Sequence, residues 1–210
     1  VDPHYDTYKR EKLPKGRNAY DDFVVGPGRF SLVIAPGESK TVMMNVSNRL
    51  GKKRLFKFVT EDMTSNEDGT NATIQLLGDE VGPYTIKDYI TVPYDSFYIE
   101  NDERAIIPVT VTLPPDAEPG GFYGSILTEV MPEERLPDDS DVAPSTALVS
   151  RIGTLFYVTT PGDIAQEGAL VEVTTVPDKS FYLEGPINIG LVYENTGSVH
   201  LTPYGTVNIT

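Results

Sequence analysis

Residues 29–48 read RFSLVIAPGESKTVMMNVSN, and residues 179–195 read KSFYLEGPINIGLVYEN. Both stretches contain an apolar segment, a Gly/Pro turn and a second, alternating segment that ends in an asparagine, Asn48 or Asn195. A short turn follows each asparagine, and a further strand is expected from Lys52 and from Val199. Two copies of one strand–turn–strand pattern predict two tandem β-sandwich modules rather than a single enzyme domain.

The fold class that this pattern predicts is all-β, with tandem immunoglobulin-like β-sandwiches of which the second is incomplete within this chain. The expected boundaries are a flexible basic arm at 1–22, a first sandwich at 23–165 and a partial second sandwich at 166–210. A complete sandwich of this type has about seven strands and roughly 100 residues, so the second module is about half of one. We expect either that the chain is truncated there or that another chain completes the module.

The overall charge limits the kinds of partner. The 210 residues carry a net charge of −14, which argues against a nucleic-acid partner and against adsorption to anionic lipid. No apolar run approaches the roughly 20 residues of a membrane span, so we expect no direct membrane insertion in this chain. Cysteine is absent, which excludes a disulfide framework and thiolate chemistry.

The first twenty residues are locally basic in an otherwise acidic chain. Prolines interrupt this segment and its hydrophobic periodicity is weak, which predicts a flexible arm. Its cations are Lys9, Arg10, Lys12, Lys15 and Arg17. The arm is either a solvated tail or a segment that docks on an acidic neighbour, such as the next copy of the chain.

Tyrosines suggest a candidate binding surface. The chain has twelve tyrosines and no tryptophan, and several of them gather around the irregular stretch 78–98. The candidates are Tyr84, Tyr89, Tyr94 and Tyr98. Aromatic side chains on a loop can stack on sugars or fill a protein interface. The alternative is that these tyrosines plug the open end of the sandwich.

A polar loop predicted at 61–71 provides a candidate calcium site. Its oxygen ligands would come from Asp62, Asn66 and Asp68, because Ca²⁺ takes six to eight oxygen atoms. The spacing does not match an EF-hand, and the alternative is a hydrophilic hairpin in which Asp68-Gly69 supplies the tight turn. No other cofactor is expected, and the composition, with no cysteine and two histidines, excludes a zinc site of the usual Cys/His type for practical purposes.

No catalytic constellation is visible, so we expect a protein that is not an enzyme. The only histidines are His4 and His200, and a serine triad would have to use one of them. We expect His200 to pack beside its turn. Carboxylates are abundant, so a pair of the glycosidase type stays open on counting alone.

Several short turns carry a family resemblance. Pro36-Gly37 leads into a strand ending at Asn48, and the Pro114 turn is followed by Gly120-Gly121 and Tyr123-Gly124. On these motifs residues 29–165 resemble the peptidoglycan-binding first domain of the WxL-interacting protein family of bacterial surface proteins. More loosely, they resemble the immunoglobulin-like domains of pilus chaperones. Gly185 to Pro203 resembles the sandwich domain that follows in such proteins.

The resemblance implies an exported, non-catalytic scaffold at the cell surface. We therefore expect an extracellular protein that binds cell-wall glycan or another surface protein. The first alternative is a self-assembling subunit of a surface layer or filament, completed by exchange of a strand or of the arm between copies. The second alternative is the carbohydrate-binding part of a glycan-active enzyme.

Overall fold

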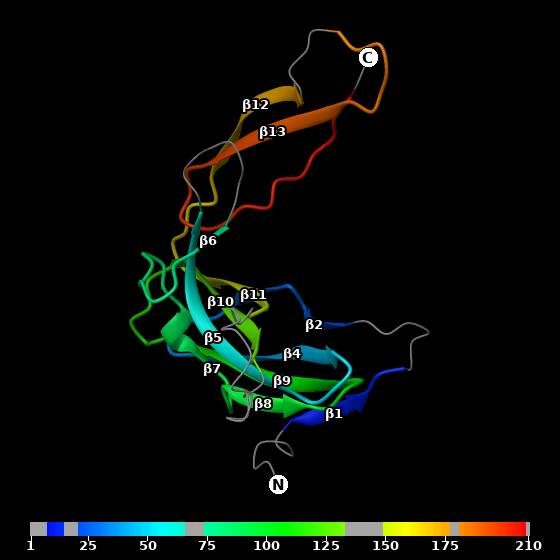
Figure 1. Cartoon of the computed structure of the whole chain (residues 1–210). Helices are drawn as coiled ribbons and strands as arrows, with labels where there is room; N and C mark the ends of the chain where they lie inside the picture. The colour runs from blue at the N-terminus through cyan, green and yellow to red at the C-terminus, as the bar shows by residue number, and fades with distance from the viewer. Residues whose placement is uncertain (1–7, 15–20, 66–73, 133–148, 177–180, 209–210) are drawn as a thin grey trace.

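The computed structural model describes residues 8–14, 21–65, 74–132, 149–176 and 181–208. The chain is all-β. Two sheets form an immunoglobulin-like sandwich, and a third sheet of two strands extends away from it as an incomplete second module (Figure 1). Within the described residues, no helix has both the length and the apolar composition needed to cross a membrane.

The first sheet has the strand order β1-β9-β4-β2, and β7 adds to the same edge of the sheet through β9. Its strands are β1 (Lys9–Lys12), β2 (Asp22–Gly26), β4 (Ser39–Arg49), β7 (Ile90–Thr91) and β9 (Glu103–Thr112). All of these pairings are antiparallel.

The second sheet has the order β3-β11-β10-β5-β6, with β8 also paired to β5. Its strands are β3 (Arg29–Val33), β5 (Arg54–Ser65), β6 (Ile74–Leu76), β8 (Ser96–Ile99), β10 (Gly120–Val130) and β11 (Arg151–Thr160). A 3-10 turn, η2 (Lys87–Tyr89), precedes β7. The chain passes from one sheet to the other between β2 and β3, and β3 pairs with β11 in parallel.

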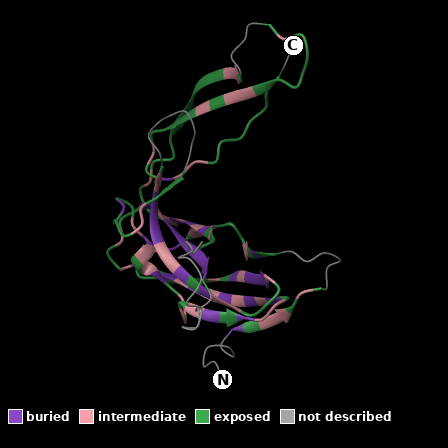
Figure 2. Ribbon diagram, in the orientation of Figure 1, coloured by how far each residue is buried: buried purple, intermediate pink, exposed green. Residues whose placement is uncertain are grey.

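The core lies between the two sheets, and Figure 2 shows the buried residues of their strands in purple. In β9 the side chains of Ile107, Val109 and Val111 are fully buried, which is the period-two pattern of a strand with one face in a core. They face a second layer that includes Phe56 and Phe156, both also fully buried. Burying an aliphatic or phenylalanine side chain contributes about 1.5–3 kcal/mol, so this layer accounts for much of the stability.

The polar segment 61–65 belongs to a strand, so the prediction of a loop starting at residue 61 is wrong for these five residues. They complete β5, and Glu61, Asp62 and Met63 are buried there. Polar composition is misleading here because both carboxylates accept backbone N–H groups of a segment that lies 17 to 24 residues further along the chain. Asp62 accepts backbone N–H groups, and Glu61 accepts the N–H of Gly78 at 3.1 Å.

The expectation of a flexible arm over 1–22 is wrong for the stretch 8–12. Residues 9–12 form β1 on the edge of β9, and the side chain of Tyr8 is only 3% exposed. The arm therefore contributes a strand that pairs with an edge of the sheet and a residue of the core. Lys15 and Arg17 lie outside the described residues.

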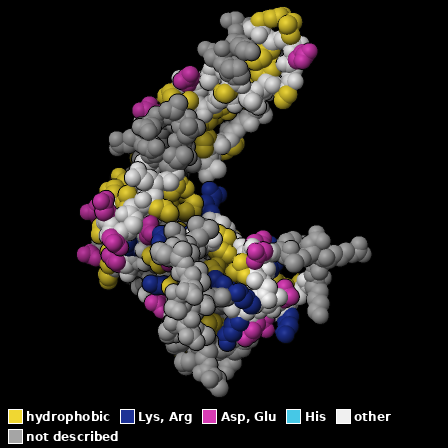
Figure 3. Space-filling view, viewed as in Figure 1, with side chains coloured by type: hydrophobic (Ala, Val, Ile, Leu, Met, Phe, Trp, Pro, Cys, Tyr) yellow, Lys and Arg dark blue, Asp and Glu magenta, His cyan; other side chains and the backbone are white. Residues whose placement is uncertain are grey.

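The second module consists of β12 (Gly168–Val176) and β13 (Asn188–Asn195). Strands were also expected at 181–183 and from 201, but the described residues there are not in strands. A strand needs a hydrogen-bonded neighbour, and in the described part of the chain no strand pairs with these segments. The module therefore exposes apolar side chains, seen in yellow in the upper part of Figure 3, and Phe181 and Leu183 are 74% and 88% exposed.

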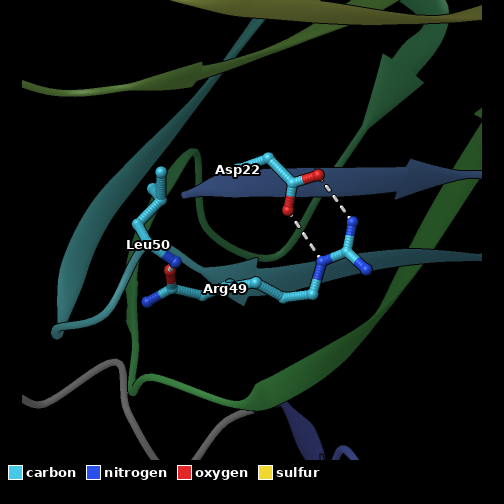
Figure 4. A network of polar contacts seen from close by, with 4 residues as sticks. Asp22, Arg49 and Leu50 are labelled. Carbon is cyan, nitrogen blue, oxygen red and sulfur yellow. Dashed lines mark hydrogen bonds and ion pairs between the residues drawn. The ribbon is translucent and has the colours of Figure 1, made fainter. Parts of the chain in front are cut away.

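The turn after β4 is held by two polar contacts. Asp22 accepts two hydrogen bonds from the Arg49 guanidinium, at 2.8 and 2.6 Å, which join β2 to the end of β4 (Figure 4). The buried Asn48 accepts the N–H of Leu50 at 3.0 Å and donates to the carbonyl of Lys52 at 2.8 Å. The amide of Asn48 thus bridges both sides of the turn that the sequence predicts.

Candidate functional site

A cleft of about 420 Å³ lies where the sandwich meets the end of the second module. Its floor comes from β10 and β11, one wall from the paired ends of β5 and β6, and the other wall from the turn that follows β13. The lining residues, hereafter the tyrosine cleft, are Met63, Thr64, Ser65, Ile74, Tyr84, Tyr123, Tyr157, Asn195, Gly197, Ser198, Val199 and His200.

Three tyrosines and a histidine form a continuous row of rings in the cleft. Tyr123 and Tyr157 are cross-strand partners on β10 and β11, and their rings meet edge to face at 5.6 Å. Tyr84 packs edge to face on Tyr123 at 6.1 Å, and His200 lies 5.1 Å from Tyr157 and 5.9 Å from Tyr123. Aromatic pairs of this kind contribute about 0.5–1.5 kcal/mol beyond their buried area, so the row is rigid.

The loop that carries Tyr84 is anchored by Asp62 at the end of β5. One carboxylate oxygen accepts the N–H of Gly82 at 3.0 Å, and the other accepts those of Ile86 and Lys87, both at 3.0 Å. Burial by itself would raise the pKa of Asp62, but the hydrogen bonds outweigh it and hold this pKa below its usual value. The ionised carboxylate therefore fixes the loop at neutral pH.

A backbone hydrogen bond then attaches this loop to the floor of the cleft. The N–H of Tyr123 donates to the carbonyl of Tyr84 at 2.9 Å. The Tyr84 side chain remains 57% exposed, so it presents most of its ring to whatever occupies the cleft. Hydrogen bonds therefore fix the backbone of the Tyr84 loop against the cleft, while the Tyr84 side chain remains accessible to a ligand.

The opposite wall is the turn after β13. Asn195 accepts the N–H of Gly197 at 3.0 Å and donates to the carbonyl of Val199 at 2.9 Å, which closes the turn. The N–H of Gly121 in β10 donates to the carbonyl of Ser198 at 3.1 Å, and Val199 is 3% exposed. These contacts fix the turn against the sandwich, so the two walls are held at a defined separation.

His200 completes the wall in its neutral form. Burial lowers its pKa first, and the nearby positive charge of Arg29 lowers it further. Nδ1 of His200 is buried and has no hydrogen-bond partner. The Arg29 guanidinium lies 5.5 Å from the centre of the Tyr157 ring, in the range of a cation–π contact.

Tyr123 also has a perturbed hydroxyl group. Burial raises its pKa, whereas a hydrogen bond with the His200 backbone acts in the opposite direction. The hydroxyl therefore stays protonated at neutral pH and keeps its capacity to donate. Among the described residues, no side chain that lines the tyrosine cleft carries a charge at pH 7, although the whole chain has a net charge of −14.

The four tyrosines predicted as a binding surface lie in different surroundings. Tyr84 lines the cleft, as described. Tyr89 and Tyr94 are partly buried against the core, so the alternative that these residues fill the sandwich holds for them. Tyr98 is 37% exposed on β8, where the Lys53 ammonium lies 4.8 Å from its ring centre.

The calcium prediction concerns Asp62, Asn66 and Asp68. Asp62 lies at the end of β5 and uses both carboxylate oxygens to hold the loop of Tyr84. Asn66 and Asp68 lie outside the described residues, so a calcium site there stays a prediction. Within the described residues, no group of three or more acidic or histidine side chains is placed to hold a metal ion.

Sequence reasoning missed Tyr123 and Tyr157 as cleft residues. The usable signal was alternation, because Phe156 and Val158 point into the core and Tyr157 therefore points outward. Recognising the cleft also required the pairing of β10 with β11 and the position of His200. Neither follows from local sequence pattern.

Comparison with known proteins gives likeness at the level of fold. No family model and no curated protein matches the chain. The specific resemblance to the WxL-interacting family therefore stays a prediction.

The similar solved structures include the class 5 fimbriae chaperone CfaA, with 11% identity and a TM-score of 0.47 over 85% of this chain and 68% of that one. A chain of the CsuC–CsuE chaperone–tip adhesion subunit pre-assembly complex of Acinetobacter baumannii has 9% identity and a TM-score of 0.44, over 89% and 90% of the two chains. The PapD-like domain 7 of human CEP192 has 10% identity and a TM-score of 0.42, over 76% and 98%. At these identities the likeness says nothing about what the chain binds.

Proposed function

We propose that this protein is a non-catalytic, extracellular surface protein that binds cell-wall glycan through the tyrosine cleft. The observation that supports this function is the uncharged, aromatic lining of the cleft in a strongly acidic chain. A charged ligand is normally met by opposite charges, whereas a sugar is recognised by ring faces and by neutral hydrogen-bonding groups. The lining offers groups of the second kind.

The geometry fits a short stretch of a polysaccharide. The volume of about 420 Å³ is within the range of roughly 300–1,000 Å³ that ligand pockets occupy. Tyr84 presents an exposed ring on which the C–H face of a sugar can stack. Thr64, Ser65 and Ser198 line the cleft with hydroxyl groups that can bond to sugar hydroxyls.

The composition of the lining supports binding rather than hydrolysis. Most glycoside hydrolases use two carboxylates on either side of the scissile bond. Among the described residues, no Asp or Glu side chain lines the cleft, and the nearby Asp62 is occupied by backbone N–H groups. Turnover of a glycan by the chain, lost on changing one carboxylate, would overturn this part of the proposal.

Co-sedimentation with purified peptidoglycan sacculi tests the function. The wild-type chain is expected to pellet with sacculi and to stay soluble without them. Tyr84→Ala should lower the bound fraction several-fold, because it removes the exposed ring and leaves the floor of the cleft intact. Tyr98→Ala is the matched control, since it removes an exposed tyrosine on β8, away from the cleft.

Two results would reject glycan binding at the cleft. The first is that the chain remains soluble at every concentration of sacculi. The second is equal loss of binding in Tyr84→Ala and Tyr98→Ala. This would mean that exposed aromatic side chains in general, and not the tyrosine cleft, bind the sacculi. Circular dichroism of each variant checks that the fold is retained.

The exposed apolar side chains of the second module favour a second candidate function, a self-assembling surface subunit. Leu170, Val173 and Val176 on β12 are 48–60% exposed, beside the exposed Phe181 and Leu183. An apolar surface of this kind on a two-stranded sheet is suited to a second copy of the chain. Pelleting in the tube without sacculi, abolished in the double variant Phe181→Ser with Leu183→Ser, would support assembly. Pelleting that the double variant does not change would reject it.

A further inference from the structure

The N-terminal strand, Tyr8 with β1, occupies an edge of the sandwich with which no other described strand pairs over this stretch. β1 runs antiparallel to β9, with Lys9 opposite Ile106 and Lys12 opposite Glu103. The N–H of Leu13 extends the pairing by donating to the carbonyl of Asp102 at 2.8 Å. β4 pairs with the other side of β9, and β7 pairs further along, so among the described strands β1 alone pairs with this edge of β9 from Glu103 to Ile106.

Tyr8 anchors this strand in a socket formed by two aromatic residues. Its ring meets Phe97 edge to face at 5.2 Å and Tyr94 at 6.2 Å. Its hydroxyl donates to the carbonyl of Tyr94 at 2.8 Å and accepts the N–H of Tyr94 at 3.0 Å. Only 3% of the surface of Tyr8 is exposed, and both its ring and its hydroxyl group make contacts in the socket.

In the register of β1 on β9, two pairs of cross-strand partners carry opposite charges. Glu11 lies directly opposite Arg104, and Lys12 lies opposite Glu103. Opposite charges on cross-strand partners are favourable, whereas a shift of one residue would lose both matches. The edge of β9 therefore recognises a particular extended segment, headed by a tyrosine and rich in charge.

The topology makes this segment separable from the domain that it completes. β1 and β2 follow one another in the chain but lie on opposite edges of the sheet. β1 pairs with β9 and with no other described strand, and the chain joins it to the sandwich only beyond Leu13. Its withdrawal would leave every other strand pairing intact and would expose one sheet edge and one aromatic socket.

We propose that this edge of β9, with the socket of Tyr94 and Phe97, is a strand-acceptor site, and that its ligand in assemblies is the Tyr8–Lys12 strand of a second copy of the chain. Each copy carries both the ligand and the site, so the complementarity needed for exchange is already built into the closed monomer. Exchange makes no new contacts and replaces an intramolecular strand with an identical one. The proposal is independent of glycan binding at the tyrosine cleft.

The absence of cysteine from the chain allows a clean test by disulfide trapping. Glu11→Cys and Arg104→Cys are made in separate chains, because these residues are Cα partners across β1 and β9. The Cα atoms of opposed residues in an antiparallel pair are about 4.5–5.5 Å apart, a separation that a disulfide can bridge. The two chains, one carrying a mass tag, are mixed at high concentration, incubated and then oxidised.

A mixed disulfide in a yield above that of random collision requires the strand of one copy to lie on β9 of the other. The matched control is Thr112→Cys paired with Glu11→Cys, because Thr112 is exposed on the same strand but outside the β1 register. The expected result is several-fold more mixed disulfide with Arg104→Cys than with Thr112→Cys. Adding Tyr8→Ala to the Glu11→Cys chain should bring the yield down to that of the control.

Equal yields from Arg104→Cys and Thr112→Cys would overturn the proposal, since they would report random collision. A yield of mixed disulfide that Tyr8→Ala does not change would overturn the role of Tyr8 as the anchor of the strand.

A second measurement is used if a cysteine variant does not fold properly. In it, a labelled peptide of residues 5–14 is titrated into the Tyr8→Ala chain. Saturable binding that is absent for the same peptide with alanine at position 8 supports the site, and no binding of either peptide rejects it.

Discussion

Asn48 and Asn195 make the same two hydrogen bonds in the two modules. In each case the side-chain carbonyl accepts the N–H two residues on, and the side-chain amide donates to the carbonyl four residues on. The four donor–acceptor distances lie between 2.8 and 3.0 Å. The repeated sequence pattern thus corresponds to a repeated structural clip, and in the second module the same clip shapes a wall of the tyrosine cleft.

Asn48→Ala should destabilise the first sandwich strongly. Asn48 is fully buried and also donates to the carbonyl of Ile99 at 2.8 Å, so alanine leaves buried backbone groups without partners. We expect the free energy of unfolding, measured by urea denaturation, to fall by about 2–4 kcal/mol. Asn195→Ala should cost only about 1 kcal/mol, because its turn is more exposed to water. Equal losses in the two variants would contradict this account.

Gly124→Ala should disturb the loop that carries Tyr84. An added Cβ would lie 2.5 Å from Cγ2 of Ile86 and 3.2 Å from the carbonyl oxygen of Glu61, and the backbone atom cannot easily move away. Such overpacking typically costs about 1–3 kcal/mol. Gly28→Ala is the control, since nothing lies within 4 Å of the Cβ position there. Thermal unfolding compares the two variants, and similar melting temperatures would contradict the prediction.

Asp62→Asn should weaken the anchor of the same loop in a pH-dependent way. Because the pKa of Asp62 is lowered in the folded chain, its stabilising effect is fully present above the ordinary value of 3.8 and is lost as the pH falls through the lower folded value. Loss of the charged hydrogen bonds should cost about 2 kcal/mol at pH 7. The difference in unfolding free energy between wild type and variant should shrink below pH 3.8, and a constant difference would refute the assignment.

His200 should titrate below pH 6.5, its ordinary value, because burial and the charge of Arg29 both lower its pKa. The neutral ring is therefore favoured in the folded chain. The contribution of the neutral His200 ring to the free energy of unfolding is fully present above pH 6.5. It declines as the pH falls from there through the lower pKa of the folded chain. NMR titration in a His4→Gln background isolates the signal of His200. A midpoint at or above 6.5, or an unchanged pH dependence of unfolding in His200→Gln, would contradict the prediction.

Local pattern was sufficient for most strands of the first module. The alternating segment that ends at Asn48 predicted β4, and the Gly/Pro turn at Pro36-Gly37 predicted the break between β3 and β4. It failed at Glu61 and Asp62, where polar side chains inside a strand are satisfied by groups some twenty residues further on. A local pattern contains no information about such distant partners.

The candidate site was harder to predict for the same reason. Tyr84 was among the expected residues, whereas Tyr123, Tyr157 and His200 join it only through strand pairing and through the position of the second module. Tyr94 was expected as a binding residue, but it forms part of the socket for Tyr8. That contact joins residues 86 positions apart, which no periodicity can reveal.

The parallel pairing of β3 with β11 has a mechanical consequence. β3 lies near the start of the sandwich, and β11 is its last strand before the second module. A pulling force applied between the N-terminal end of β3 and the C-terminal end of β11 acts along both strands in opposite directions. It loads all of their hydrogen bonds in shear at once instead of peeling them apart one at a time. Under such a force, the hydrogen bonds between β3 and β11 would therefore resist unfolding of the sandwich. The second module follows β11 in the chain, so it would transmit the force to this pair of strands.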